Sequence, residues 1–342
     1  MGKQPSFRTL FAVITAGIML VLGAAATGAG AGPQASKQLP TVTLGTARDL
    51  PSALLYGMPR FAERFGIKLE IKQGSTFADV ERFLTLGDAD VAFLGYHNIA
   101  VLADKGVTDV KVIAGVHRRG TQFIARQGSG IQRWKDIEGK RIALIQGSYT
   151  AVMFMVAASS NGVDLSKVRF TNMTPVIPTV VSALRSGTYD GLVIWPPDRQ
   201  KIMADSGAYL PRNLNIYRSD LGDPFGLLVA SGDFMKNPGQ LRSFLRAYVA
   251  SVNHYKKNPR QWAELAVQIS GADRAAAERA ILNDRYKPVI SFKVKRSALI
   301  AAAKRGTKFG FTRSNHASKV AGYLNLGPLA RVLKVKPASL IG

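Results

Sequence analysis

The sequence predicts an α/β fold made of two similar lobes, and two observations support this prediction. The first is an internal repeat, because residues 82–95 and 182–195 share Leu, Gly and Asp at an offset of 100 residues, starting from Leu84, Gly87 and Asp90. The second is the alternation of apolar strands with helices, which is typical of parallel sheets covered by helices on both faces. At 342 residues the chain is long enough for two lobes. Two lobes that face each other would enclose a cleft.

The first copy of the repeat accounts for the predicted elements up to residue 126. Strands are expected at residues 42–45, 68–72 and 91–94, and helices at residues 54–65, 76–86 and 99–105. Thr76 and Asp79 predict a capping box at the start of the second helix, and Gly66, Gly87 and Gly106 predict the helix ends. Two further strands, at 110–116 and 122–126, are expected to cross from one lobe to the other.

The second copy repeats this order. Strands are expected at residues 141–145, 168–171 and 192–195, and helices at residues 149–160, 178–187 and 198–205. Strands at 216–218 and 225–230 then return the chain to the first lobe. Helices at 238–257, 260–269, 274–284 and 295–309 complete the predicted fold. The boundaries that follow are residues 38–118 and 225–342 for lobe one, and residues 119–224 for lobe two.

The N-terminal residues have the pattern of a signal peptide. Lys3 and Arg8 precede an apolar run at residues 10–22, which is too short to span a bilayer comfortably. Small residues follow, with cleavage motifs ending at Ala26 and Ala31. We therefore expect residues 1–31 to be removed on export to the periplasm.

The amino-acid composition excludes several kinds of site and partner. The chain contains no Cys, which excludes disulfides, thiolate metal sites and Cys nucleophiles. Its 46 basic and 22 acidic residues give a formal net charge of +24. Such an excess suits nucleic acid, an anionic membrane or an anionic ligand, but export argues against nucleic acid. Because the basic residues form no long arm or stripe, we interpret them mainly as a solvated surface.

The predicted ligand site lies where the strands end. Open α/β sheets bind ligands outside the carboxyl ends of their strands, and the repeat pairs the loops 46–51 with 146–151, 73–76 with 173–178, and 95–98 with 195–198. The candidate ligand-binding residues are Thr46, Arg48, Asp49, Gly74, Ser75, Thr76, Tyr96, His97, Gln146, Gly147, Ser148, Tyr149, Thr174, Trp195 and Phe225.

The chemistry of these loops favours an anion. Ser75 and Ser148 follow a Gly and precede a helix, so hydroxyls, free helix amides and the helix dipole meet there, although simple N-capping is the alternative. A helix end contributes only about 0.3–1 kcal/mol to a charge, whereas micromolar binding needs about 8 kcal/mol. A cation and apolar contact must supply the rest. Arg48 and His97 are the cations in the loops, with His117, Arg118 and Arg119 at the crossover. Tyr96, Tyr149, Trp195 and Phe225 are the candidate apolar walls, unless they belong to the core.

Enzymatic signatures are scarce. The chain has no nucleophile elbow, no HExxH motif and no phosphate-binding P-loop. Its four His residues have no carboxylate or second His at metal-ligand spacing. We expect no catalysis, no metal and no cofactor.

Several motifs occur in a fixed order along the chain. They are Phe65-Gly66-Ile67, Phe83-Leu84-x-x-Gly87-x-x-Asp90, residues 137–143, Gly147-Ser148, Ala183-Leu184-x-x-Gly187-x-x-Asp190, Trp195-x-Pro197 and Phe244-Leu245-x-Ala247-Tyr248. With the signal peptide, this order resembles the periplasmic solute-binding proteins of nitrate, sulfonate and taurine ABC importers. The resemblance implies a type II periplasmic binding fold, in which two Rossmann-like lobes joined by two crossover strands, with C-terminal helices, close on a solute. It also implies a monomer that delivers the solute to a membrane permease.

One departure from that family bears on the ligand. The family commonly has a Glu between the Trp and the Pro of the second copy, where this chain has Pro196. The change disfavours taurine and other amino-bearing ligands and leaves sulfonates, nitrate and aromatic carboxylates. We therefore expect a small, sulfonate-like organic anion, with an aromatic carboxylate or a heterocycle such as a pyrimidine precursor as the alternative. Related enzymes of pyrimidine synthesis need a Cys-rich motif, and this chain has no Cys. Related transcription regulators need an N-terminal DNA-binding module, and a signal peptide stands there instead. We therefore expect neither role.

Overall fold

The computed structural model describes residues 38–47 and 51–342. Residues Leu39–Gly342 form one compact unit. The predicted signal peptide at residues 1–31 lies outside the described residues, and so do Arg48 and Asp49. Among the described helices, none combines the length and the apolar character that crossing a bilayer would require.

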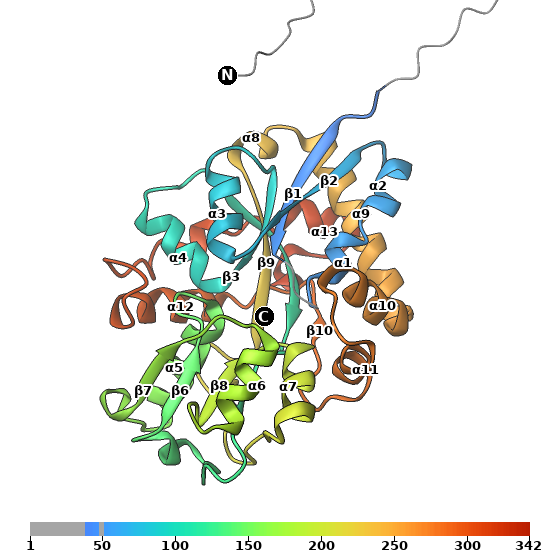
Figure 1. Cartoon of the computed structure of the whole chain (residues 1–342). Helices are drawn as coiled ribbons and strands as arrows, with labels where there is room; N and C mark the ends of the chain where they lie inside the picture. Colours follow the sequence, from blue (N-terminus) through green and yellow to red (C-terminus); the bar gives the residue numbers. More distant parts are fainter. Residues whose placement is uncertain (1–37, 48–50) are drawn as a thin grey trace, which may run out of the picture. The chain divides into compact units, whose positions relative to one another are not determined.

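The larger of two sheets has six strands in the order β10-β4-β9-β3-β1-β2 (Figure 1). The strands are β1 (Thr41–Ala47), β2 (Lys68–Gly74), β3 (Val91–Gly95), β4 (Lys111–Arg118), β9 (Pro224–Ala230) and β10 (Val289–Ile290). β1 runs parallel to β2 and β3, whereas β9 runs antiparallel to both β3 and β4. β3 and β9 are buried along their whole length, and their sequences are continuous apolar runs. Such runs are typical of strands that are covered on both faces.

The smaller sheet has four strands in the order β5-β8-β6-β7. They are β5 (Gln122–Ala125), β6 (Arg141–Leu144), β7 (Arg169–Asn172) and β8 (Gly191–Ile194). β6 runs parallel to β7 and β8, and β5 pairs antiparallel with β8. The chain passes from the larger sheet to the smaller between β4 and β5 and returns in β9, which confirms the two predicted crossovers.

Helices cover both sheets. Those of the repeat are α1 (Ala53–Tyr56), α2 (Pro59–Ala62), α3 (Phe77–Thr85), α4 (Tyr96–Asp104), α5 (Tyr149–Ser160), α6 (Ile177–Arg185) and α7 (Asp198–Ser206). The C-terminal ones are α8 (Gly232–Met235), α9 (Pro238–Lys257), α10 (Pro259–Ser270), α11 (Arg274–Glu278), α12 (Arg296–Lys308) and α13 (Gly327–Leu333). The short helical turns are η1 (Glu63–Phe65), η2 (Trp134–Ile137), η3 (Leu165–Lys167), η4 (Arg279–Asn283), η5 (Val320–Tyr323) and η6 (Pro337–Leu340).

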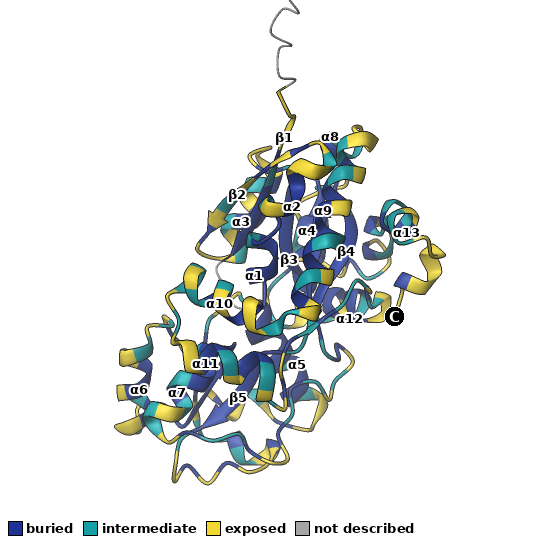
Figure 2. Ribbon diagram, turned by 90° about the vertical axis from the view of Figure 1, so that its right-hand side faces the viewer, coloured by how far each residue is buried: buried dark blue, intermediate teal, exposed yellow. Residues whose placement is uncertain are grey.

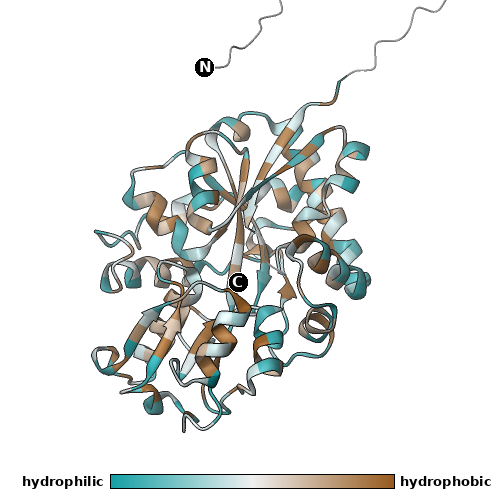
Figure 3. Cartoon of the chain, in the orientation of Figure 1, coloured by the Kyte–Doolittle hydropathy of each residue, from teal (hydrophilic) through white to brown (hydrophobic). Residues whose placement is uncertain are grey.

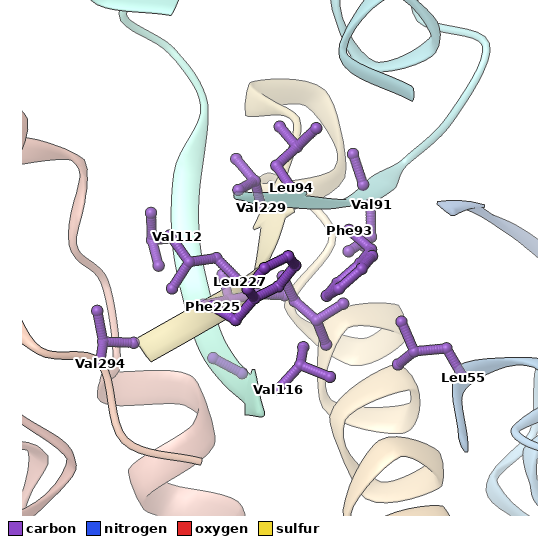
Figure 4. Packing of buried hydrophobic residues seen from close by; sticks show 14 of the residues in the cluster. Leu55, Val91, Phe93, Leu94, Val112, Val116, Phe225, Leu227, Val229 and Val294 are labelled. Carbon is purple, nitrogen blue, oxygen red and sulfur yellow. The ribbon is translucent and has the colours of Figure 1, made fainter. Parts of the chain in front are cut away.

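The core follows the sheets. Figure 2 shows buried residues along the strands and on the inner helix faces, and Figure 3 shows hydrophilic residues mostly on the outer helices and loops. In the larger core, Phe225, Leu227 and Val229 of β9 lie among side chains of β3 and β4 (Figure 4). Two smaller clusters include Phe123 and Ile124, which are neighbours on β5 and so point to opposite faces of the smaller sheet.

The internal repeat is visible in the hydrogen bonds. The Thr43 amide donates to the Asp90 carboxylate at 2.8 Å, and the Arg141 amide donates to the Asp190 carboxylate at 3.0 Å. Each Asp therefore ties its own strand to the first strand of its copy. Thr43 and Arg141 are 98 residues apart, however, whereas Asp90 and Asp190 are 100 apart. The expectation of one constant offset is wrong by two residues in the first strand. The loops after β1 and β6 therefore correspond at an offset of 98 residues rather than 100.

Four other expectations need correction. Residues 216–218 form turns rather than a strand, because the buried Ile216 packs into the core from a loop. The helix predicted at 54–65 is broken before Pro59 into α1, α2 and η1. The helix expected at 274–284 becomes a π-helical turn, η4, over its second half. The strand β10 and the helix α13 were not predicted.

Candidate ligand cavity

A cavity of about 510 Å³ lies between elements of the two sheets. Its walls come from the ends of β1, β6 and β8, the start of β9, the helices α3 and α4, the first turn of α5, and the residues after α12. The lining residues are Ala47, Ser75, Thr76, Phe77, Ala78, Glu81, His97, Asn98, Val101, Lys105, Ile145, Gln146, Gly147, Ser148, Tyr149, Thr150, Pro175, Trp195, Phe225, Gly310 and Phe311. The position agrees with the rule that ligands bind beyond the carboxyl ends of strands.

Most of the predicted ligand-binding residues meet in this cavity. Its lining includes nine of the fifteen candidates: Ser75, Thr76, His97, Gln146, Gly147, Ser148, Tyr149, Trp195 and Phe225. Arg48 and Asp49 lie outside the described residues, directly after Ala47 in the sequence. Thr46, Gly74, Tyr96 and Thr174 are described but do not line the cavity.

Those four residues lie elsewhere for local reasons. Thr46 is fully buried, and its hydroxyl donates to the Ala47 carbonyl at 3.3 Å. Tyr96 is 1% exposed, and its hydroxyl accepts a hydrogen bond from the Lys295 amide at 3.0 Å. Gly74 packs so closely under α3 that an added Cβ would lie 3.0 Å from Val80. Thr174 is exposed, and the adjacent Pro175 lines the cavity instead.

The N-terminus of α5 is the part of the cavity that suits an anion. Ser148 caps the helix by accepting a hydrogen bond from the Ala151 amide at 3.2 Å, and its hydroxyl donates to the Ile145 carbonyl at 2.6 Å. The amides of Tyr149 and Thr150, the first two helical residues, have no carbonyl partner within the helix. The first turn contains no acidic residue. These amides and the helix dipole therefore face the cavity without a carboxylate of their own.

The N-terminus of α3 differs, because a carboxylate already occupies it. Thr76 and Asp79 form the predicted capping box, in which the Asp79 carboxylate accepts from the amides of Thr76 at 2.9 Å and Ser75 at 3.1 Å. Hydrogen bonds from Thr76 hold the pKa of Asp79 below its usual value. Thr76 is therefore the N-cap of this helix, and Ser75 contributes its backbone amide to the same carboxylate.

Aromatic rings form much of the remaining wall. His97 of α4 stacks on Tyr149 of α5, with ring centroids 5.4 Å apart and planes 5° apart. Tyr149 in turn meets Phe225 edge-on at 5.4 Å, and its hydroxyl donates to the Pro224 carbonyl at 3.3 Å. Burial lowers the pKa of His97 to about 4, against a smaller opposing effect of a hydrogen bond with the Gly147 backbone. The imidazole is therefore neutral near pH 7 and acts as an aromatic wall rather than as a cation.

Glu81, Asn98 and Lys105 form a polar group in the cavity wall, which the sequence did not single out. The Glu81 carboxylate, only 3% exposed, accepts from Asn98 Nδ2 and from Lys105 Nζ, both at 2.7 Å. Asn98 also accepts from the Gly95 amide at 3.1 Å. Within the described lining, Lys105 is the one Lys or Arg, and its charge is balanced by Glu81. Among the described residues, those of the cavity included, no three His, Asp or Glu side chains gather as metal ligands would.

The fold and the cavity define a class of protein: two α/β lobes of the periplasmic binding type, with a ligand-sized cavity between them. The NMT1/THI5-like family model matches residues 61–262, and the chain belongs to that family. The resemblance found in the sequence is thereby confirmed.

Two relatives support the same class. The chain is 25% identical to the taurine-binding periplasmic protein of Escherichia coli (strain K12) over 232 residues, which cover 67% of this chain and 70% of the relative. It is 26% identical to a putative aliphatic sulfonates-binding protein of Bacillus subtilis (strain 168) over 280 residues, covering 79% and 81%. These relatives are solute-binding proteins rather than enzymes.

Solved structures share the fold. The alkanesulfonate-binding protein SsuA from Xanthomonas axonopodis pv. citri, bound to MOPS, matches with a TM-score of 0.67 and 16% identity, covering 83% of this chain and 98% of that structure. A desulfurization enzyme, DSZB, also matches, with a TM-score of 0.63, 15% identity and coverage of 86% and 99%. The fold alone therefore does not separate binding from catalysis.

Proposed function

We propose that this chain is the substrate-binding component of an ABC importer and that it binds an organic anion, sulfonate-like, in the cavity between its lobes. The observation that supports this most strongly is the N-terminus of α5, whose free amides face a cavity with aromatic walls. The relatives that bind taurine or sulfonates support the same class of ligand.

The size of the cavity favours an anion with an organic body. Ligand pockets of roughly 300–1,000 Å³ hold drug-sized molecules, and this cavity measures about 510 Å³. Nitrate would fill a small part of it and would make no contact with the wall formed by Phe225 and Trp195. An anionic head at α5 with a body against these rings uses both parts of the lining. A relative of the same fold is bound to MOPS, a sulfonate with a ring.

The same arrangement suggests how the solute is held and delivered. We place lobe one at residues 38–118 and 225–342 and lobe two at residues 119–224, so that the first turns of α4 and α5 come from different lobes. Closure of the lobes would bury the ligand and strengthen each polar contact by excluding water. The signal peptide at residues 1–31 would place the protein in the periplasm, where a permease of the inner membrane receives the solute.

An aromatic carboxylate is the second candidate. The ring stack of His97, Tyr149 and Phe225 favours a planar body. A carboxylate could accept from the same α5 amides as a sulfonate. Size and aromatic character therefore favour both over nitrate, and the choice between them depends on the head group.

Isothermal titration calorimetry on residues 39–342 tests the proposal. We expect benzenesulfonate to bind more tightly than ethanesulfonate, and both to bind more tightly than nitrate and taurine. Stronger binding of benzoate than of benzenesulfonate would select the second candidate. Absence of heat with every anion would contradict the proposal, and turnover of a bound sulfonate would reveal an enzyme.

A further inference from the structure

Charge is distributed unevenly along the chain. All 22 acidic residues lie between Asp49 and Asp284, whereas residues 285–342 contain 13 Lys or Arg and no acidic side chain. Residues 39–284 hold 30 basic and 22 acidic residues, a net charge of +8 over 246 residues, against +13 over the last 58 residues. The basic excess is therefore concentrated at the C-terminus, in contrast to the scattered surface inferred from the whole sequence.

The fold brings parts of this segment together. Val294 forms a parallel bridge with Ile341, and its amide donates to the Leu340 carbonyl at 2.8 Å. Lys293 and Lys295 therefore lie beside the last residues of the chain. Residues 334–336, which connect α13 to η6, lead directly to the same place. Figure 2 shows α12, α13 and the C-terminus on one side of the larger sheet.

Few of these cations are neutralised. Arg305 pairs with Asp220 and Arg313 pairs with Asp104, so two of the 13 have an acidic partner. Within the part of the chain that the structure describes, the other 11 form no salt bridge. Several are exposed lysines, namely Lys287, Lys293, Lys304, Lys308, Lys319, Lys334 and Lys336. Lysines of this kind contribute mobile point charges rather than a fixed pocket for one small anion.

Exposed aliphatic side chains accompany the lysines. Val335 is 43% exposed and lies between Lys334 and Lys336, and Ile341, 42% exposed, pairs through the backbone with the segment of Lys293. A combination of lysines and exposed aliphatic side chains suits the interface of an anionic bilayer, where the cations meet headgroups and the aliphatic groups enter the acyl boundary. A soluble polyanion would give the aliphatic groups no role.

We propose that this surface, which comprises Lys293, Lys295, Lys334, Val335, Lys336 and Ile341, docks on a bilayer containing anionic phospholipid. It is separate from the ligand cavity, to which residues 285–342 contribute only Gly310 and Phe311. Docking therefore goes beyond the proposed function and does not depend on the identity of the solute. It would concentrate the protein at the membrane and reduce its search for a membrane partner.

Vesicle co-sedimentation of residues 39–342 tests the docking. This fragment lacks the apolar run at residues 10–22, which could itself bind lipid. We expect it to sediment with phosphatidylcholine vesicles that contain phosphatidylglycerol, and not with phosphatidylcholine alone. Each cation at an anionic surface contributes roughly a fivefold gain in affinity. The double variant Lys293→Glu and Lys336→Glu should therefore bind at least about tenfold more weakly.

A matched control separates a local surface from overall charge. Arg169→Glu with Arg212→Glu makes the same change in charge at two exposed arginines outside the segment, and it should leave vesicle binding nearly unchanged. Equal loss in both double variants, or no sedimentation of the unmodified fragment, would overturn the proposal. A third variant, Val335→Ser with Ile341→Ser, should weaken binding to vesicles. If that variant binds like the parent, the surface recognises anions in general and the bilayer assignment fails.

Discussion

The two copies of the internal repeat share their backbone pattern and differ in what they bury. In each, an Asp at the start of the third strand accepts a hydrogen bond from an amide of the first strand. In each, a Gly with φ near +77° ends the helix before it, at Gly87 and Gly187. The buried side chains after the third strand differ, however: the first copy has Ile99, and the equivalent position in the second copy is Arg199.

That difference shows where the second copy is attached to the rest of the molecule. Ile99 packs into the larger hydrophobic core. Arg199 is fully buried, pairs with Asp284 at 2.6 Å and donates to the Gly120 carbonyl. Gln200 donates to the same carboxylate at 2.6 Å. One repeat position therefore serves packing in the first copy and anchors α7 to the end of η4 in the second.

The largest expected effect comes from removing that anchor. Arg199→Leu leaves the Asp284 carboxylate, whose side chain is 11% exposed, without its cation. Breaking a buried ion pair on one side costs about 3–5 kcal/mol, and urea denaturation should show this loss. The matched change Ile99→Leu conserves volume and should cost less than about 1.5 kcal/mol. Equal losses at the two positions would remove the distinction between them.

The two Asp residues offer the next comparison. Asp190 also pairs with Arg126 at 3.1 Å and Arg141 at 3.3 Å, and although burial acts to raise its pKa, the hydrogen bonds from Arg141 and Arg126 leave it lowered. Asp190→Asn should lower the free energy of unfolding by about 1.5–3 kcal/mol. Asp90→Asn, which keeps an oxygen for the Thr43 amide, should lower it by less. The contribution of Asp190 to stability should also decrease as the pH falls below about 4. A carboxyl group whose pKa is lowered on folding stabilises the protein fully only above its unfolded-state pKa.

Acid should destabilise the first copy through His97. The equivalent position in the second copy is Pro197, which has no titratable side chain. Burial lowers the pKa of His97 to about 4 in the folded state, against about 6.5 in the unfolded state. The unfolded state therefore binds the proton first, so stability is complete above about pH 6.5 and falls toward pH 4. Between pH 7 and pH 5 the loss from His97 should be roughly 2 kcal/mol. In thermal melts, His97→Phe should reduce this acid-induced loss, and an unchanged pH dependence would contradict the assignment.

The smallest effects distinguish the two helix ends at the cavity. Ser148→Ala and Thr76→Ala each remove an N-cap, which should cost about 1 kcal/mol of stability in either case. In titrations with benzenesulfonate, Ser148→Ala should weaken binding a few-fold, because it loosens the turn that presents the Tyr149 and Thr150 amides. Thr76→Ala should leave the affinity nearly unchanged, since Asp79 occupies that helix end. An unchanged affinity for Ser148→Ala would remove Ser148 from the proposed site.

Much of the architecture could be predicted because each signal was local. Alternating strands, Gly stops and the Thr76–Asp79 capping box depend on neighbouring residues, and the structure has them. The failures involve longer-range packing. Ile216 is apolar and buried but lies in a turn, so its hydrophobicity led to the wrong prediction of a strand. β10 has only two residues, and its pairing with β4 depends on a partner more than 150 residues away.

The cavity shows the same limit. Gly147, Ser148 and Trp195 were identifiable because they follow strands of the repeat. Glu81 and Lys105 were not, because charged residues in a helix or at its end are typical of a solvated surface until the helices are placed side by side. The structure joins them at 2.7 Å in the cavity wall. Pairings between separate helices carry no sequence signal of their own.

The register of β4 and β9 has a consequence for engineering. Arg118 pairs with Pro224, so the chain leaves the larger sheet and re-enters it at neighbouring points. Everything between them, including the whole smaller sheet, is one continuous stretch of sequence. That stretch is topologically an insertion in a hairpin, and a short loop could bridge its two ends. The segment could therefore be exchanged as a cassette between relatives, carrying the α5 helix end with it and leaving the larger sheet unbroken.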